Sequence, residues 1–185
     1  VIALVKRMPL LLAVAVLLTG SLQAQEAPRD TVAMAAAADS NLAPFRKYPT
    51  LPAFNVLMMD STTIYNTFNI PKGRKIAIVL FSPDCSHCKR LTDKLMAGMD
   101  SLANLDFYFF TPYSKMEEIQ KFYSLHKLAE YKNVKIVGRD VEFFSARFYE
   151  LHMFPAVAIY DEQKKLIDLV EGEAPVSYIY KMINK

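Results

Sequence analysis

Cysteine is scarce in this sequence of 185 residues, which holds only Cys85 and Cys88 and no other thiol that could pair with either. An excess of charge of one sign is also lacking, because 22 basic and 19 acidic side chains leave a formal net charge of +3. Such a weak balance gives no argument for a nucleic-acid partner. After residue 24, no apolar run reaches the roughly 20 residues of a membrane span. What is present is a chain of ordinary single-domain length that is 52% hydrophobic, enough to build one core.

The first 24 residues have the pattern of a secretory signal peptide. Lys6 and Arg7 form a positive region, residues 9–18 are an uninterrupted apolar and proline stretch, and Leu22-Gln23-Ala24 offers a cleavage site. An uncleaved anchor is the weaker alternative, because the apolar stretch is shorter than the roughly 20 residues that cross a bilayer. We therefore expect residues 1–24 to be removed and the mature protein to be periplasmic or secreted. Membrane contact is expected only if the signal stays uncleaved.

The remainder divides into a lead-in and one domain. Residues 25–49 show no sustained apolar period and contain several prolines, so we expect a flexible tether. From residue 50 to 185, strand-like and helix-like patterns alternate, which is typical of an α/β fold around a mixed central sheet flanked by helices. Strands are expected at residues 54–59, 76–81, 107–110, 134–137, 156–160 and 166–170, the last two as a hairpin. Helices are expected at residues 88–103, 114–128, 141–151 and from 175 to the end.

Two of these helices carry more specific predictions. Ser114 and Glu117 have the spacing of a capping box, which would open the helix at residues 114–128. The last helix has apolar positions at the i, i+3, i+4, i+7 spacing of a buried face. The residues expected on that face are Val176, Ile179, Tyr180 and Ile183.

The two cysteines lie between the apolar strand at residues 76–81 and the following helix, in the run Ser82-Pro83-Asp84-Cys85-Ser86-His87-Cys88-Lys89. As a structural crosslink they would close a loop of four residues and stabilise by only about 2 kcal/mol, less than a longer loop would. At a helix start, unpaired backbone N–H groups and the helix dipole stabilise a thiolate on the first sulfur. The two-residue gap lets the second sulfur resolve a mixed disulfide. We therefore expect a redox-active disulfide in which Cys85 attacks and Cys88 resolves.

From about residue 50 to the end, the chain resembles the thioredoxin superfamily, specifically its extracytoplasmic TlpA/ResA-like thiol–disulfide oxidoreductases. The motifs that carry the resemblance are Cys85-Ser86-His87-Cys88 and Phe154-Pro155. It implies a thioredoxin-like fold with a helix–strand element added between the dithiol helix and Pro155, two landmarks that lie 70 positions apart in the chain. It also implies a cis bond before Pro155, which would face the dithiol and leave neighbouring backbone to pair with an extended substrate. Substrate contacts are expected around Phe154 and Ser86.

Several positions depart from the thioredoxin pattern. Val79 stands where thioredoxins bury an acid, Asp84 stands where they have Trp, and Ser86-His87 replaces Gly-Pro. His87 resembles the arrangement in DsbA-type oxidants, and its partial protonation would stabilise the Cys85 thiolate and raise the reduction potential. We expect a potential between the thioredoxin value of about −270 mV and the DsbA value of about −120 mV. A solvated histidine of little effect is the alternative.

Three other interpretations stay open. The run Ser82-Pro83-Asp84-Cys85 fits a peroxiredoxin-like pattern, although Ile78 stands where those proteins have proline. A metal carrier could hold Cu(I) through both cysteines together with His126 or His152. A binding module could leave the dithiol idle. The main interpretation calls for no cofactor and no metal. Its expected partners are protein thiols or disulfides and a membrane or extracytoplasmic redox protein.

Overall fold

The computed structural model describes residues 42–112 and 115–185. The predicted signal peptide, residues 25–41 of the predicted tether and the predicted helix cap Ser114 lie outside these residues. Among the residues that are described, no helix has both the length and the apolar character needed to cross a membrane.

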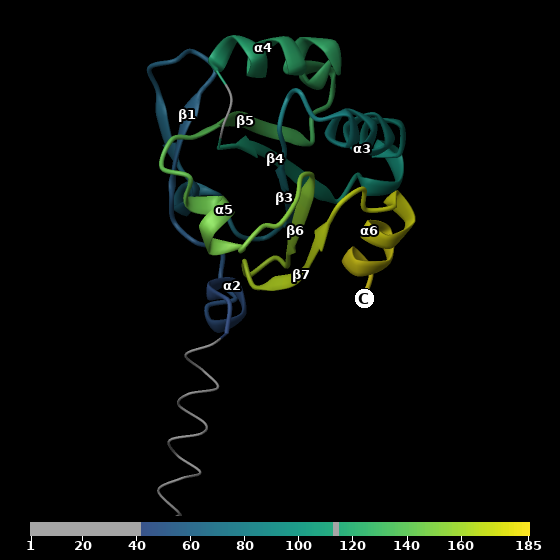
Figure 1. The fold of residues 1–185 in the computed structure, drawn as a ribbon. Helices are drawn as coiled ribbons and strands as arrows, with labels where there is room; N and C mark the ends of the chain where they lie inside the picture. Colours follow the sequence, from purple (N-terminus) through teal and green to yellow (C-terminus); the bar gives the residue numbers. More distant parts are fainter. Residues whose placement is uncertain (1–41, 113–114) are drawn as a thin grey trace, which may run out of the picture. The chain divides into compact units, whose positions relative to one another are not determined.

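A mixed sheet of seven strands forms the centre of the fold, in the order β2-β1-β5-β4-β3-β6-β7 (Figure 1). The strands are β1 (Asn55–Met58), β2 (Ile64–Asn66), β3 (Lys75–Leu80), β4 (Leu105–Thr111), β5 (Val134–Asp140), β6 (Ala156–Tyr160) and β7 (Leu166–Glu171). β4 pairs in parallel with both β3 and β5, whereas all other neighbours are antiparallel. The prediction of a mixed sheet is confirmed, as is the terminal β6–β7 hairpin.

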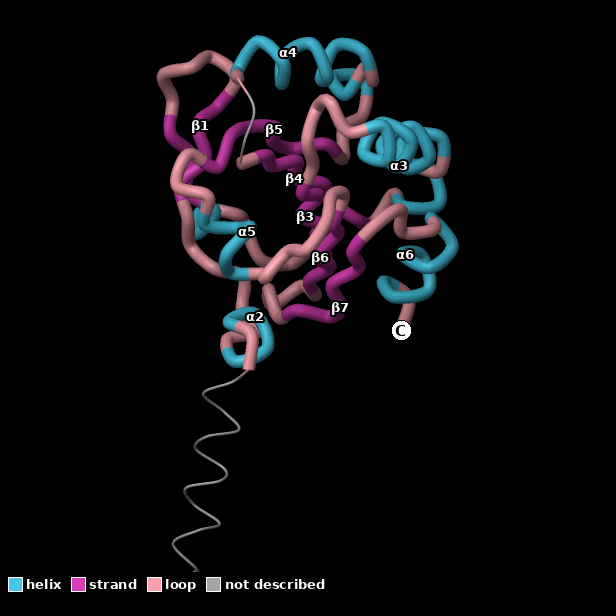
Figure 2. Tube along the Cα trace, in the orientation of Figure 1, coloured by secondary structure: helices cyan, strands magenta, loops and turns pink. Residues whose placement is uncertain are grey.

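Helices lie on both faces of the sheet (Figure 2). They are α2 (Pro44–Lys47), α3 (Ser86–Ala97), α4 (Met116–Leu125), α5 (Phe144–Phe148) and α6 (Val176–Ile183), with 3₁₀ turns η1 (Thr67–Asn69), η2 (Met99–Leu102) and η3 (Leu128–Glu130). α3, α4 and α6 bury their apolar residues in one core, and α2 and α5 pack into a second core on the opposite face. The continuously apolar β3 supplies both cores, with Ala77 and Val79 in the first and Ile76, Ile78 and Leu80 in the second. A strand covered on both faces has no polar side to present, which explains the unbroken apolar run.

Three predictions about the helices were wrong in detail, two about helix limits and one about a capping residue. α3 begins at Ser86 rather than at residue 88, because Cys85 already serves as its N-cap, and after Ala97 the chain tightens into η2. The acid predicted in the capping box of α4 was wrong by one residue, since Glu118 and not Glu117 accepts a hydrogen bond from the backbone N–H of Lys115, at 3.2 Å. α5 is limited to Phe144–Phe148, because Phe143 takes a left-handed backbone conformation with φ of 54°.

The face of α6 and the start of the domain also differ from the expectations. Tyr180, predicted to be buried, is 49% exposed, and Met182 takes its place in the core. Pro44–Lys47, expected to lie in the flexible tether, form α2, and Phe45 packs into the second core with 9% of its surface exposed. The ordered domain therefore begins before residue 50. The short strand β2 was not predicted.

Candidate functional site

Cys85 lies where the loop after β3 meets the first turn of α3. It is the N-cap residue of that helix, and its sulfur accepts a hydrogen bond from the backbone N–H of Cys88 at 3.3 Å. The sulfur thereby takes one of the donors that a helix start leaves without an intrahelical partner. A negative charge at this position interacts favourably with the helix dipole.

Cys88 lies one turn into α3 and is 1% exposed, whereas Cys85 is half-buried. The Cys88 sulfur accepts a hydrogen bond from the backbone N–H of Ser82 at 3.4 Å. Burial, followed by the hydrogen bond with the neighbouring Cys85, raises the pKa of the Cys88 thiol to about 12. Cys88 is therefore protonated at neutral pH, and Cys85 is the sulfur that an approaching molecule meets first.

The loop before β6 faces the dithiol. The peptide bond between Phe154 and Pro155 is cis, as the resemblance implied. The Cys85 thiol lies 3.7 Å from the carbonyl oxygen of Phe154, and the Phe154 side chain packs against both cores. β6 pairs antiparallel with β3, so these residues, which directly precede β6, lie at the end of the sheet where β3 leads into the Cys85 loop. Ser86, the other predicted substrate contact, is the exposed first residue of α3.

Residues 171–173, at the end of β7 and the start of its connection to α6, bind the backbone of the Pro155 loop. The backbone N–H of Gly172 donates to the carbonyl oxygen of Pro155 at 2.7 Å, and its φ of 86° is a conformation that favours glycine. The Glu171 carboxylate accepts hydrogen bonds from the backbone N–H groups of His152 at 2.8 Å and Met153 at 3.0 Å. Burial acts to raise the pKa of Glu171, but these bonds outweigh it and the pKa is lowered.

The next residue but one, Glu173, binds three basic side chains of α3. Its carboxylate accepts hydrogen bonds from Arg90 at 2.9 and 2.6 Å and from Lys94 at 2.8 Å, and it lies 2.8 Å from Nδ1 of His87. Hydrogen bonds from Arg90, Lys94 and His87, in that order, lower the pKa of Glu173 to about 2. The structure thus places the predicted site residue His87 in a charged cluster at the start of α3, with its side chain 63% exposed.

Glu173, Arg90 and Lys94 were not predicted as site residues from the sequence. His87, Arg90 and Lys94 follow the i, i+3, i+7 spacing of one helix face, which was the available signal for a basic stripe. The acid that meets this stripe lies 79 positions beyond Lys94 and 86 positions beyond His87. No local pattern links residues at that separation.

The other residues singled out in the sequence take structural or surface positions. Val79 is fully buried in β3 and Asp84 is exposed in the loop before Cys85. His126 contacts Asp93 at 2.7 Å, and His152 contacts Glu171 at 3.3 Å. Within the described part of the chain, no group of three His, Cys, Asp or Glu side chains could hold a metal ion.

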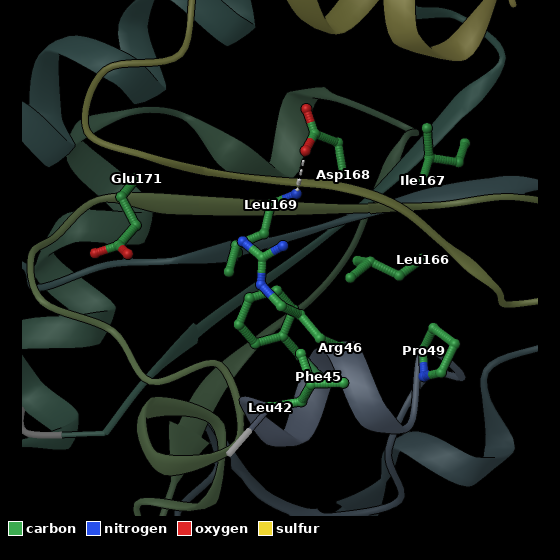
Figure 3. A pocket seen from close by; sticks show the side chains of 9 residues that line it. All are labelled: Leu42, Phe45, Arg46, Pro49, Leu166, Ile167, Asp168, Leu169 and Glu171. Carbon is green, nitrogen blue, oxygen red and sulfur yellow. Dashed lines mark hydrogen bonds between the residues drawn. The ribbon is translucent and has the colours of Figure 1, made fainter. Parts of the chain in front are cut away.

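Two of the hollows on the surface of the described residues lie near elements of the site. One of about 570 Å³ lies between α2 and β7, and Figure 3 shows Arg46 from α2 extending across it towards the strand that carries Asp168 and Glu171. Its lining residues include neither cysteine nor Pro155, so we do not assign it to the dithiol site. The other, of about 260 Å³, lies beside the dithiol. It is lined by Pro83 and Asp84 of the preceding loop, Lys89 of α3, and Glu118, Lys121, Phe122 and Leu125 of α4.

Comparison with known proteins places the domain in a family. A family model described as a thioredoxin-like domain matches residues 69–185. The comparison with curated protein sequences finds no match. The chain belongs to the thioredoxin-like family, and the predicted membership of the thioredoxin superfamily is confirmed.

Solved structures with the same fold include several thiol–disulfide oxidoreductases. The thioredoxin domain of one from Bacteroides vulgatus has 15% sequence identity and a TM-score of 0.56, over 71% of this chain and 91% of its own. StoA from Bacillus subtilis has 13% identity and a TM-score of 0.55, over 72% and 98%. A secreted Mycobacterium tuberculosis disulfide oxidoreductase homologous to DsbE of E. coli has 13% identity and a TM-score of 0.54, over 71% and 94%. At these identities the likeness is one of fold.

Proposed function

We propose that the protein is an extracytoplasmic thiol–disulfide oxidoreductase that exchanges electrons with protein substrates through Cys85 and Cys88. The observation that carries the proposal is the placement of the Cys85 sulfur. It caps α3 through the Cys88 N–H and lies 3.7 Å from the carbonyl oxygen that precedes the cis-proline. One reactive sulfur thus stands between a helix start and a segment of backbone that can contact an extended peptide.

Reduction of a substrate proceeds in two exchanges. The Cys85 thiolate attacks one sulfur of the substrate disulfide, forming a mixed disulfide and releasing the other substrate sulfur as a thiolate. Cys88, once deprotonated, attacks the Cys85 sulfur, forming the Cys85–Cys88 disulfide and releasing the second substrate thiolate. Two electrons pass from the protein to the substrate, and the reverse sequence oxidises a substrate dithiol.

The proton of Cys88 needs an acceptor in the second exchange, because its pKa of about 12 keeps the thiol protonated. Val79 stands at the position where thioredoxins have a buried acidic residue as the proton acceptor, and a valine cannot accept a proton. The substrate thiolate released by the first exchange is itself a base, and we assign it this role. Cys88 would then become nucleophilic only after a mixed disulfide has formed.

Export is part of the proposal. The pattern of residues 1–24 supports it, as does the fold likeness to a protein whose description calls it secreted. An oxidising compartment would suit a chain whose two cysteines form one redox pair. Its partners there would be substrate proteins and a membrane or extracytoplasmic redox protein.

The test is reduction of insulin disulfides by the wild-type protein and by Cys85→Ser, with folding checked by circular dichroism. We expect turnover by the wild type and its loss in Cys85→Ser. Cys88→Ser should accumulate mixed disulfides, which would identify natural substrates when trapped in cells. Equal rates for wild type and Cys85→Ser would instead favour the binding-module interpretation. Metal bound by the reduced protein in chelator-free buffer would favour the carrier interpretation.

The direction of electron flow is tested by equilibration with glutathione buffers. We expect a potential between about −270 mV and about −120 mV, because positive charge on His87 would favour the Cys85 thiolate and thus the reduced form. A potential at or below the thioredoxin value would contradict the contribution of His87.

A further inference from the structure

Glu173 neutralises a row of basic groups that runs along α3 from the dithiol. His87, Arg90 and Lys94 lie on one face of the helix, and all three contact the same carboxylate at 2.6 to 2.9 Å. Glu173 is partly covered, with 19% of its side chain exposed, but the cluster as a whole faces solvent, because at least half of each basic side chain is exposed. A single acid thus offsets positive charge along this face of α3, from His87 in the first turn to Lys94 in the last. Charge in the first turn acts on a thiolate at the helix start.

His87 contacts both this acid and its neighbour Arg90 through the same ring nitrogen. Nδ1 of His87 lies 2.8 Å from Oε1 of Glu173 and 2.7 Å from Nη2 of Arg90. A carboxylate only accepts hydrogen bonds and a guanidinium only donates them. A hydrogen bond to Glu173 therefore requires a proton on Nδ1, whereas a hydrogen bond from Arg90 requires an Nδ1 without one.

The 171–173 connection also fixes the opposite side of the site. Gly172 binds the carbonyl oxygen of Pro155, and Glu171 binds the backbone of His152 and Met153. One short segment thus joins the dithiol helix to the proline loop. Glu173 is the residue of this segment that carries the contact to α3.

We propose that Glu173 is a positioning residue that sets the redox equilibrium of the Cys85–Cys88 pair, by holding His87 and offsetting the basic row on α3. The inference rests on the proposed exchange function. It adds to that function a determinant of the potential that lies outside the Cys-x-x-Cys motif.

The sign of the effect follows from counting charges. Glu173→Gln removes one negative charge, and His87 can respond by losing no more than one proton. Arg90 and Lys94 remain charged throughout, so the net charge of the cluster rises or stays the same but does not fall. The other charged or titratable groups described around the site are unchanged. They are Asp84, Lys89, Glu118 and Lys121 around the hollow beside the dithiol, and His152 with Glu171 beside Pro155. A more positive helix start stabilises the Cys85 thiolate and with it the reduced protein.

The experiment is equilibration of the full chain with glutathione redox buffers for wild type, Glu173→Gln, Glu173→Asp and Glu162→Gln. Glu162 lies in the turn after β6, at the opposite end of that strand from Pro155, so Glu162→Gln is a matched loss of charge away from the site. We expect Glu173→Gln to shift the equilibrium towards the reduced protein by about twofold to fivefold, the effect of one solvent-exposed charge. Glu173→Asp, which retains the charge, and Glu162→Gln should stay close to wild type.

Two further readouts separate charge from structure. High salt should reduce the difference between wild type and Glu173→Gln, because the cluster is solvent-exposed. In the His87→Ala background, the effect of Glu173→Gln should differ from its effect in wild type, since the two residues act together. An equilibrium unchanged in Glu173→Gln, or shifted equally in Glu173→Asp, would overturn the proposal. A wild-type protein that does not equilibrate with glutathione at all would instead overturn the exchange function.

Discussion

At the scale of single residues, the two sulfurs occupy different surroundings although they lie three positions apart. Cys85 is half-buried at the helix start, whereas Cys88 packs in the first core with neighbours such as Phe81 and Leu91. Burial disfavours the charged form of a thiol, and Cys88 is the residue on which that cost falls. The division of roles between the sulfurs follows from this difference in solvation.

Selective alkylation tests that difference. In the reduced, folded protein near neutral pH, iodoacetamide should modify Cys85 more than about 100-fold faster than Cys88, because alkylation needs a thiolate and the Cys88 pKa is far above neutral. Peptide mapping by mass spectrometry would give the two rates. In urea-unfolded protein the rates should converge, and similar rates in the folded state would contradict the assignment.

The raised pKa of Cys88 also predicts a loss of stability at alkaline pH. The value moves from 9.0 to about 12 on folding, so in rising pH the unfolded thiol loses its proton first. The corresponding stabilisation is fully present below pH 9.0 and is lost as pH rises towards about 12. The stability difference between reduced wild type and Cys88→Ala, measured by urea unfolding, should therefore narrow across this range. Tyrosine titration is common to both proteins and cancels, and a constant difference would refute the argument.

At the scale of elements, the position of the β1–β2 hairpin depends on a close approach between β1 and β5. Gly138 on β5 lies opposite Met58, and a Cβ added there would lie 2.6 Å from the carbonyl oxygen of Leu57 and 2.6 Å from the Val56 side chain. The carbonyl belongs to the backbone and cannot rotate away. Only glycine allows β1 to pair at this distance.

Gly138→Ala should therefore lower the free energy of unfolding by about 1–3 kcal/mol, the usual cost of overpacking. Lys135→Ala, an exposed position on the same strand, is the matched control and should change stability by no more than about 0.5 kcal/mol. Chemical denaturation of both variants gives the comparison. If Gly138→Ala is as stable as the Lys135→Ala control, β1 can move away from β5 without lowering the free energy of unfolding.

The elements that the sequence predicted well are those with long one-sided or two-sided apolar patterns. β3, β4 and β6 are buried along nearly their whole length, and their apolar runs mark them directly. β2 has three residues, none of them fully buried, so it carries no comparable pattern. α5 was predicted too long because the spacing of its apolar residues does not reveal the left-handed backbone conformations at Phe143, just before the helix, and at Glu150, just after it.

At the scale of the whole molecule, the domain includes a segment that composition alone assigned to a tether. Phe45 of α2 packs beside Tyr149, with ring centroids 6.3 Å apart, in the second core. Lys164 and Leu166, at the start of β7, also bond to the backbone of Leu51 and Pro49. The three prolines and polar residues of this segment predicted a tether, and the packing of Phe45 could not be predicted because its contacts come from residues about 100 positions away.

Phe45→Ala should lower the free energy of unfolding by about 3–5 kcal/mol, the cost of removing a buried aromatic ring. Leu42→Ala removes a side chain that is 46% exposed and should have a much smaller effect. Insulin reduction by the folded fraction of Phe45→Ala should match wild type, because Phe45 lies in the second core, whereas Cys85 and Cys88 pack in the first. If Phe45→Ala leaves the free energy of unfolding unchanged, residues 42–49 belong to the tether and not to the domain.

Local sequence patterns also predicted only part of the site. Cys85, Cys88 and Pro155 were found because each has a motif or a neighbouring strand that marks it. The carboxylate of Glu173 reaches α3 only because β7 lies at the edge of the sheet beside β6, an arrangement that exists after the sheet has formed. Residues recruited by the tertiary fold leave little trace in the sequence around them.

The recessed position of Cys88 has a consequence for oxidative damage. A peroxide reaching the pair meets Cys85 first and converts its thiolate to a sulfenic acid, which a second oxidation would carry irreversibly to the sulfinic acid. Cys88, covered by the core and one helical turn away, is placed to condense with that sulfenic acid, releasing water and forming the intramolecular disulfide. We expect accidental oxidation therefore to end in the same disulfide that exchange produces, from which a reductant restores the protein.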